Sequence, residues 1–187
     1  MSIFEYIIAS FTILLGLAFT RLLHALPYVF IKGKRDFIHS TLFLSTLFLL
    51  VQMWWIKWSF VEVKSWDFIK YFLLLLDFGV IFMLCDAVAP SNAESISSWN
   101  NFFHKVRNRW FYLLIFKFIL TGFENWYMLP NTKPFNYIGA LFICFLPFIA
   151  INSKNEKTLK IISILILIIF ISIPIIWAFK ASPLNEP

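Results

Sequence analysis

The sequence of 187 residues is 60% apolar and 14% charged, with a formal net charge of +6. Soluble domains contain fewer apolar and more charged residues, so this composition argues against a water-soluble fold. The basic residues are scattered between long apolar stretches instead of forming a stripe, which argues against nucleic acid as a partner. The lipid bilayer is the expected partner, and the long continuous apolar stretches predict an all-α integral membrane protein.

Six apolar stretches follow one another along the chain, each near the roughly 20 residues that a helix needs to cross a hydrocarbon core of about 30 Å. They cover about 3–30, 37–60, 66–89, 110–129, 135–151 and 159–179. The first has no basic leader and no small-residue cleavage site, so we expect it to be retained. The sequence therefore predicts one transmembrane domain, residues 1–187, built as a bundle of six transmembrane helices.

The segment 91–108, between the third and fourth stretches, is too polar to cross a membrane. Its apolar side chains recur at helical spacing, with basic and polar side chains between them. The apolar set is Ile96, Trp99, Phe102, Phe103, Val106 and Trp110, and the polar set is His104, Lys105, Arg107 and Arg109. This pattern predicts an amphipathic helix that lies in the membrane interface.

The distribution of Lys and Arg indicates the orientation, because basic loops are retained in the cytoplasm during insertion. One set of loops holds nine such residues, Lys32, Lys34, Arg35, Lys105, Arg107, Arg109, Lys154, Lys157 and Lys160. The other side holds Lys57, Lys64, Lys70, Lys133 and Lys180, partly as snorkelling side chains at span ends. An aromatic belt falls at the same outer ends: Trp54, Trp55, Trp58, Trp66, Trp126, Trp177, Tyr127 and Tyr137. We therefore expect both termini to be extracytoplasmic.

Several short segments consist of residues suited to helix packing and to the membrane interface. They are Phe4-Glu5-Tyr6, Leu15-Gly16-Leu17, Arg21-Leu22-Leu23, Gln52 with Trp54-Trp55, and Trp66. Through these segments the chain resembles a family of uncharacterised small bacterial multi-pass membrane proteins, and the likeness extends over most of the chain. The resemblance implies a membrane-helix fold of about six helices and a bacterial inner membrane. It implies no activity, and no functional residue is carried over from it.

Charges inside the predicted spans are the best clue to function, because each costs a few kcal/mol at the bilayer centre unless it is paired or hydrated. Counting about 1.5 Å per residue from the span ends places Asp77 and Lys117 at nearly equal depth, close to mid-membrane. Arg21 and Asp86 share a depth nearer the cytoplasmic surface. Both are candidate ion pairs, which either fix the register of the helices or belong to a proton or ion pathway.

Glu124 adds a further polar position in the outer half of the predicted bundle. It lies seven residues after Lys117, on the same helical face, and its depth matches that of Gln52. These residues fit either a polar track that runs outward from Lys117 or a single interhelical hydrogen bond.

The three histidines, His24, His39 and His104, lie toward the predicted cytoplasmic side, as do Cys85 and Asp86. An interfacial zinc site is chemically conceivable there, but none of the histidines stands in a paired metal-binding spacing. We expect no metal and no cofactor, and the sequence singles out no catalytic residue.

Three classes of function remain, because the loops are too short to form a soluble domain. The leading hypothesis is a non-enzymatic transport, channel or sensing module, a homo-oligomer because six helices enclose little space. The first alternative is a structural or partner-binding membrane subunit that docks a cytoplasmic protein on segment 91–108. The second alternative is an interfacial metal-dependent membrane enzyme that uses the histidines and Asp86.

Overall fold

The computed structural model describes residues 3–31, 34–57, 60–61, 63, 65–129 and 143–180. The regular elements in these ranges are all helices: α1 (Ile3–Val29), α2 (Phe37–Lys57), α3 (Phe68–Val88), the short 3₁₀ helix η2 (Ala93–Ser95), α4 (Trp99–Met128), α6 (Phe145–Asn152) and α7 (Glu156–Lys180). The predicted all-α class is thus confirmed. Most of the predicted fifth span, 135–151, lies outside the described residues, as do Trp58 and Tyr137 of the predicted aromatic belt.

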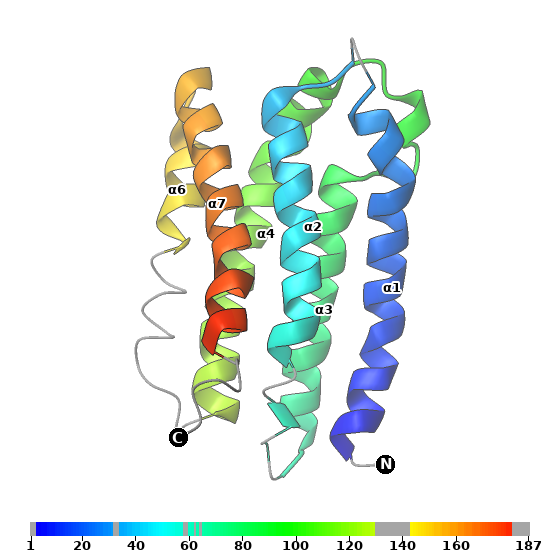
Figure 1. The fold of residues 1–187 in the computed structure, drawn as a ribbon, viewed down its shortest axis with the longest axis vertical. Helices are drawn as coiled ribbons and strands as arrows, with labels where there is room; N and C mark the ends of the chain where they lie inside the picture. Colours follow the sequence, from blue (N-terminus) through cyan, green and yellow to red (C-terminus); the bar gives the residue numbers. More distant parts are fainter. Residues whose placement is uncertain are drawn as a thin grey trace.

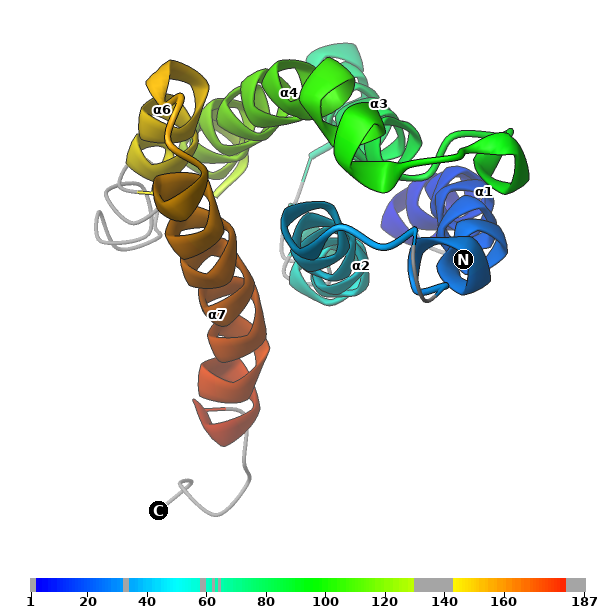
Figure 2. The same ribbon diagram turned by 90° about the horizontal axis from the view of Figure 1, so that it is seen from above.

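The long helices run side by side along one axis (Figure 1). Seen along that axis, α6, α4, α3 and α1 form a row, and α2 and α7 lie on one side of it (Figure 2). Helix α2 is the most central, since it packs against α1, α3, α4 and α7. This position surrounds much of α2 with protein and makes its polar residues candidates for a buried site.

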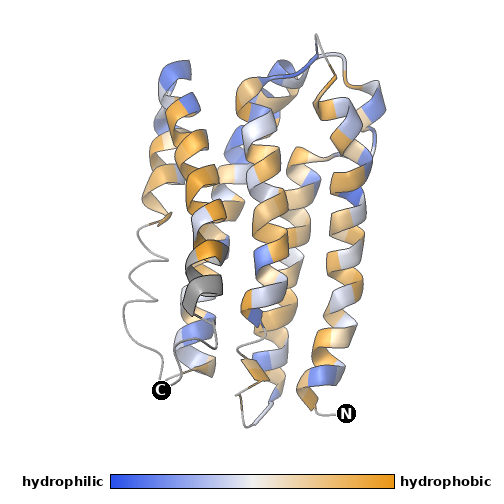
Figure 3. Ribbon diagram, viewed as in Figure 1, coloured by the Kyte–Doolittle hydropathy of each residue, from blue (hydrophilic) through white to orange (hydrophobic). Residues whose placement is uncertain are grey.

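Three helical segments are long and apolar enough to cross a membrane within the part of the chain that the structure describes. They are Ile3–Val29, Phe37–Lys57 and Phe68–Ser95. Apolar residues fill the middle of the helices, whereas hydrophilic residues are frequent at the upper connections (Figure 3). Large apolar side chains also cover the outside of the bundle, among them Ile13, Val51, Ile119 and Ile168. An exterior this apolar is typical of a membrane protein and suits contact with lipid.

Polar capping residues set where the helices begin. The carboxylate of Asp36 accepts a hydrogen bond from the backbone N–H of His39 (2.8 Å) at the start of α2. Asp67 caps α3 in the same way through Lys70 (2.9 Å), and Ser98 precedes α4. These side chains satisfy N–H groups that have no partner inside the helix. The connections formed by the described residues 30–31 with 34–36, 89–98 and 153–155 lie at one end of the bundle, the upper end in Figure 1.

The segment 91–108 differs from its prediction as a separate surface helix. Helix α4 begins at Trp99 and continues unbroken to Met128, so it includes the predicted fourth span. Trp99, Phe103 and Trp110 are fully buried in the bundle instead of facing lipid. The indole of Trp99 stacks on His39 with 4.5 Å between ring centroids. Helical periodicity identified the apolar face correctly, but the same period describes a face that meets lipid and a face that meets protein.

Candidate functional site

Four charged side chains come together inside the bundle. Lys57 lies in the last turn of α2, Asp77 in the middle of α3, and Lys117 and Glu124 on α4. Each is at most 2% exposed. Lys117 and Glu124 are two helical turns apart and therefore share one face of α4. We call these four residues the charge cluster.

The signs of charge alternate through the cluster. Asp77 is shared by both lysines, with Oδ1 2.6 Å from Nζ of Lys117 and Oδ2 2.8 Å from Nζ of Lys57. The ammonium group of Lys57 also donates to a carboxylate oxygen of Glu124. Two positive and two negative charges thus form a chain of net charge zero, and this neutrality offsets part of the desolvation cost of burying them.

Neighbouring groups supply further contacts to the lysines. The hydroxyl of Thr121 accepts a hydrogen bond from Nζ of Lys117 (2.5 Å). Nζ of Lys57 lies 4.7 Å from the centre of the Phe60 ring, which is a cation–π arrangement. One acid oxygen, Oε1 of Glu124, is buried with no hydrogen-bond partner among the described residues. Glu124, at one end of the charge cluster, therefore has an acceptor oxygen that no hydrogen bond uses among the described residues.

A cavity of about 50 Å³ lies beside the cluster, between α2, α4 and α7. Lys57 and Lys117 line it together with Thr121 and Asn125. Most of its lining is apolar, but its volume has room for water beside the two lysines.

Gln52 lies on the wall of this cavity, but it contacts α7 instead of Glu124. Its side-chain amide donates to the backbone carbonyl of Phe170. In a helix that carbonyl would accept from the residue four positions later, which here is Pro174 and has no N–H. Gln52 thus satisfies a carbonyl that a proline leaves without its helical partner. The polar neighbour of Glu124 is Lys57, and Gln52, which the sequence matched to it in depth, is not.

A second group of charges lies toward the opposite end of the bundle. Asp86 contacts Arg21, as predicted, and its Oδ2 is also 3.3 Å from Nη2 of Arg109. Arg21 lies over the ring of Phe82 as well. About a third of the Arg21 and Asp86 side chains is exposed. Ion pairs this accessible contribute little to stability, so these residues are better suited to the membrane interface than to a buried site.

Sequence reasoning missed Lys57, which we expected as a snorkelling lysine on the outer side. The structure corrects this, because the side chain of Lys57 is 2% exposed. A signal was present in the sequence: Lys57 follows Leu49, Leu50 and Met53 at helical spacing, and these residues form the buried face of α2. Lys57 lies on the face that turns inward.

The histidines occupy three separate places. His39 is buried, and its Nε2 lies 3.1 Å from the carbonyl oxygen of Val88. The ring of His24 lies beside Tyr28, and that of His104 beside Phe103. No group of three or more His, Cys, Asp or Glu residues gathers within the described ranges in a way that would hold a metal ion. The weak zinc candidates His24, His39 and His104 therefore do not form a common site in the described part of the chain.

Comparisons with protein-family models, with curated proteins and with solved structures found no match to this chain. No activity can therefore be transferred from a relative. The charge cluster, the only group of buried opposite charges from three helices within the described residues, is the best basis for a function.

Proposed function

We propose that the chain is a non-enzymatic transport, channel or sensing module of a bacterial inner membrane, in which the charge cluster responds to protons. One observation carries this proposal: four ionisable side chains are at most 2% exposed inside an apolar bundle. Ionisable residues at such positions are expensive and typically mark ion or proton pathways. Stability alone does not account for them, because apolar residues of similar volume are often at least as stabilising as a buried ion pair.

In the proposed response to protons, Glu124 takes up the proton first. Its Oε1 is buried without a hydrogen-bond partner among the described residues, whereas each oxygen of Asp77 lies at ion-pair distance from a lysine, so a proton can be added at Oε1. Protonation changes the net charge of the cluster from zero to +1, because both lysines then share only Asp77. A buried excess charge favours a conformation in which one lysine reaches water. The cluster thereby links proton binding to a change in helix packing, as a transporter or sensor requires.

The proposed topology has six crossings, with the upper end of Figure 1 in the cytoplasm and both chain termini outside. The placement of the basic residues supports it, since Lys34, Arg35 and Lys154 lie in connections at that one end. The exposed Trp55 and Trp126 lie near the opposite end, where an aromatic belt would meet the outer interface. The resemblance to small bacterial membrane proteins supports the inner membrane as the location. We also propose a homo-oligomer.

A structural or partner-binding subunit is the second candidate. It is favoured by the observation that every charge in the cluster contacts one of opposite sign. Such an arrangement would lock the register of α2, α3 and α4 without any proton transfer. The placement of the three histidines gives no support to a metal-dependent enzyme.

Proton flux in reconstituted vesicles tests the leading proposal. The purified protein is placed in vesicles that contain a pH-sensitive dye, and a potassium diffusion potential drives protons inward. We expect acidification above that of empty vesicles, and loss of this flux in Glu124→Gln. The matched control is Glu156→Gln, which removes an exposed carboxylate that pairs with Lys160 (2.9 Å) in the first turn of α7.

Infrared spectroscopy tests the sensing form of the proposal, which needs no net flux. The band of a protonated carboxylic acid should rise and fall with pH in the wild-type protein and disappear in Glu124→Gln. If the folded wild-type protein shows neither proton flux nor this titration, the register-lock function replaces the proposal.

A further inference from the structure

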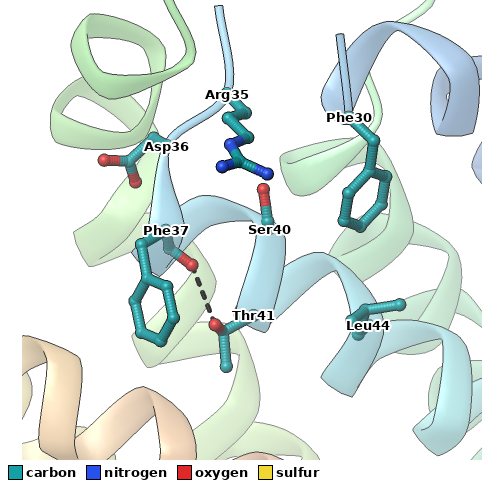
Figure 4. Close-up of a pocket in the computed structure, with 7 residues that line it drawn as sticks. All are labelled: Phe30, Arg35, Asp36, Phe37, Ser40, Thr41 and Leu44. Atoms are coloured by element: carbon teal, nitrogen blue, oxygen red, sulfur yellow. Dashed lines mark hydrogen bonds between the residues drawn. The ribbon is translucent and has the colours of Figure 1, made fainter. Parts of the chain in front are cut away.

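A second cavity, of about 450 Å³, opens where α1 ends and α2 begins. Its apolar walls are Phe30, Phe37 and Leu44, and its polar groups come from Arg35, Asp36, Ser40 and Thr41. Figure 4 shows the guanidinium of Arg35 and the hydroxyl of Ser40 turned toward each other. This volume lies within the range of about 300–1,000 Å³ that is typical of small-molecule sites.

The polar groups of the cavity differ in whether they are already engaged. The Asp36 carboxylate points away from Arg35 in Figure 4; its Oδ1 accepts from the N–H of His39 and its Oδ2 from the amide of Asn100 (3.0 Å). The Thr41 hydroxyl donates to the Phe37 carbonyl (2.8 Å). By contrast, the Ser40 hydroxyl is buried with no hydrogen-bond partner among the described residues. A cation and a hydroxyl are therefore left for a ligand.

Contacts on both sides of Arg35 fix its backbone. The carbonyl of the preceding Lys34 accepts from the backbone N–H of Trp99 (3.3 Å). The following Asp36 is held by Asn100, one residue further along α4. Arg35 therefore stands on a connection that α4 holds in place, and this preorganisation lowers the entropic cost of binding an anion.

An apolar surface leads away from the cavity along α2. Phe37, Phe48 and Val51 are each more than a third exposed and follow one another, with Leu44, at helical spacing. In Figure 2, the ribbon of α2 has an open side between α1 and α7. A ligand that fits both the cavity and this apolar surface has an anionic head and a long apolar tail.

We propose that this cavity binds an anionic phospholipid of the leaflet at the basic end of the bundle. A phosphate oxygen accepts from the Arg35 guanidinium and from the Ser40 hydroxyl, and an acyl chain lies along Leu44, Phe48 and Val51. The exposed Lys34 adds positive charge nearby without lining the cavity. Basic side chains at a helix end attract anionic headgroups, and the walls of the cavity turn this general attraction into a defined site. The site does not depend on the charge cluster.

Native mass spectrometry of the full chain in detergent tests the site by titrating phosphatidylglycerol against phosphatidylcholine of the same chain length. We expect at least one phosphatidylglycerol to bind, and Arg35→Gln to weaken it about tenfold, which is about 1.4 kcal/mol, because the charge-assisted hydrogen bond to the phosphate is lost. Lys34→Gln is the matched control and should weaken binding less than twofold. Leu44→Trp should also weaken binding, because it fills the cavity and leaves the charge unchanged.

Three results would overturn the proposal. Equal weakening by Arg35→Gln and Lys34→Gln would mean diffuse attraction between charges. Equal binding of the two lipids would remove the role of the anionic head. Displacement of the lipid by inorganic phosphate would identify a site for free phosphate. Circular dichroism of each variant checks that its helix content is unchanged.

Discussion

Asp77 on α3 and Lys117 on α4 form an ion pair buried from solvent, with 2.6 Å between Oδ1 and Nζ. Removal of either partner leaves an uncompensated charge in the bundle, which typically costs about 3–5 kcal/mol. Asp77→Asn should be the more harmful single change, because Asp77 also neutralises Lys57. The double variant Asp77→Asn with Lys117→Gln restores charge balance and should be milder than the sum of the two. Thermal unfolding in detergent, arranged as a double-mutant cycle, measures this coupling; additive losses would contradict the pair.

Gln52 should matter only as long as residue 174 is proline. Gln52→Leu leaves the Phe170 carbonyl without a donor and should cost about 1–3 kcal/mol. Pro174→Ala supplies the missing backbone N–H, so the double variant should regain much of the stability lost in Gln52→Leu. Thermal midpoints of the wild type, the two single variants and the double variant decide this. A double variant no more stable than Gln52→Leu would mean that the amide acts in another way.

Trp99 distinguishes a buried start of α4 from a helix that lies on the membrane surface. Its indole N–H donates to the Tyr28 carbonyl (2.9 Å), and its ring is fully buried. Trp99→Ala should therefore destabilise the protein by about 3–5 kcal/mol in thermal unfolding. The control Trp126→Ala removes a tryptophan that is 61% exposed and should change stability by no more than about 0.5 kcal/mol. Similar effects of the two changes would favour a surface position for Trp99.

Cysteine labelling in intact cells tests the topology. In a background in which Cys85 and Cys144 are replaced by alanine, Asp67→Cys should react with a membrane-impermeant thiol reagent. Asn155→Cys should react only after the membrane is opened, because Lys154 in this connection and Lys157 and Lys160 at the start of α7 predict a cytoplasmic position. The opposite labelling pattern would invert the whole topology.

Depth counting from the sequence found the contacts between Asp77 and Lys117 and between Arg21 and Asp86, because long straight helices convert residue number into depth reliably. It failed for Lys57. Depth along one span does not reveal which helix becomes central, and α2 packs against four others, so a lysine on its inward face is covered by protein. The prediction of a surface helix around Trp99 was wrong for a related reason. The apolar face of this segment has the same sequence pattern whether lipid or protein covers it.

Synthesis of the chain places the members of the charge cluster in a fixed temporal order. Lys57 emerges from the ribosome before either of its acids, and 67 residues separate it from Glu124. The Lys57 ammonium group can meet Asp77 once α3 is made, but its second acid, Glu124, exists only after α4. The charge-neutral set of four is therefore complete only when the fourth long helix has been made.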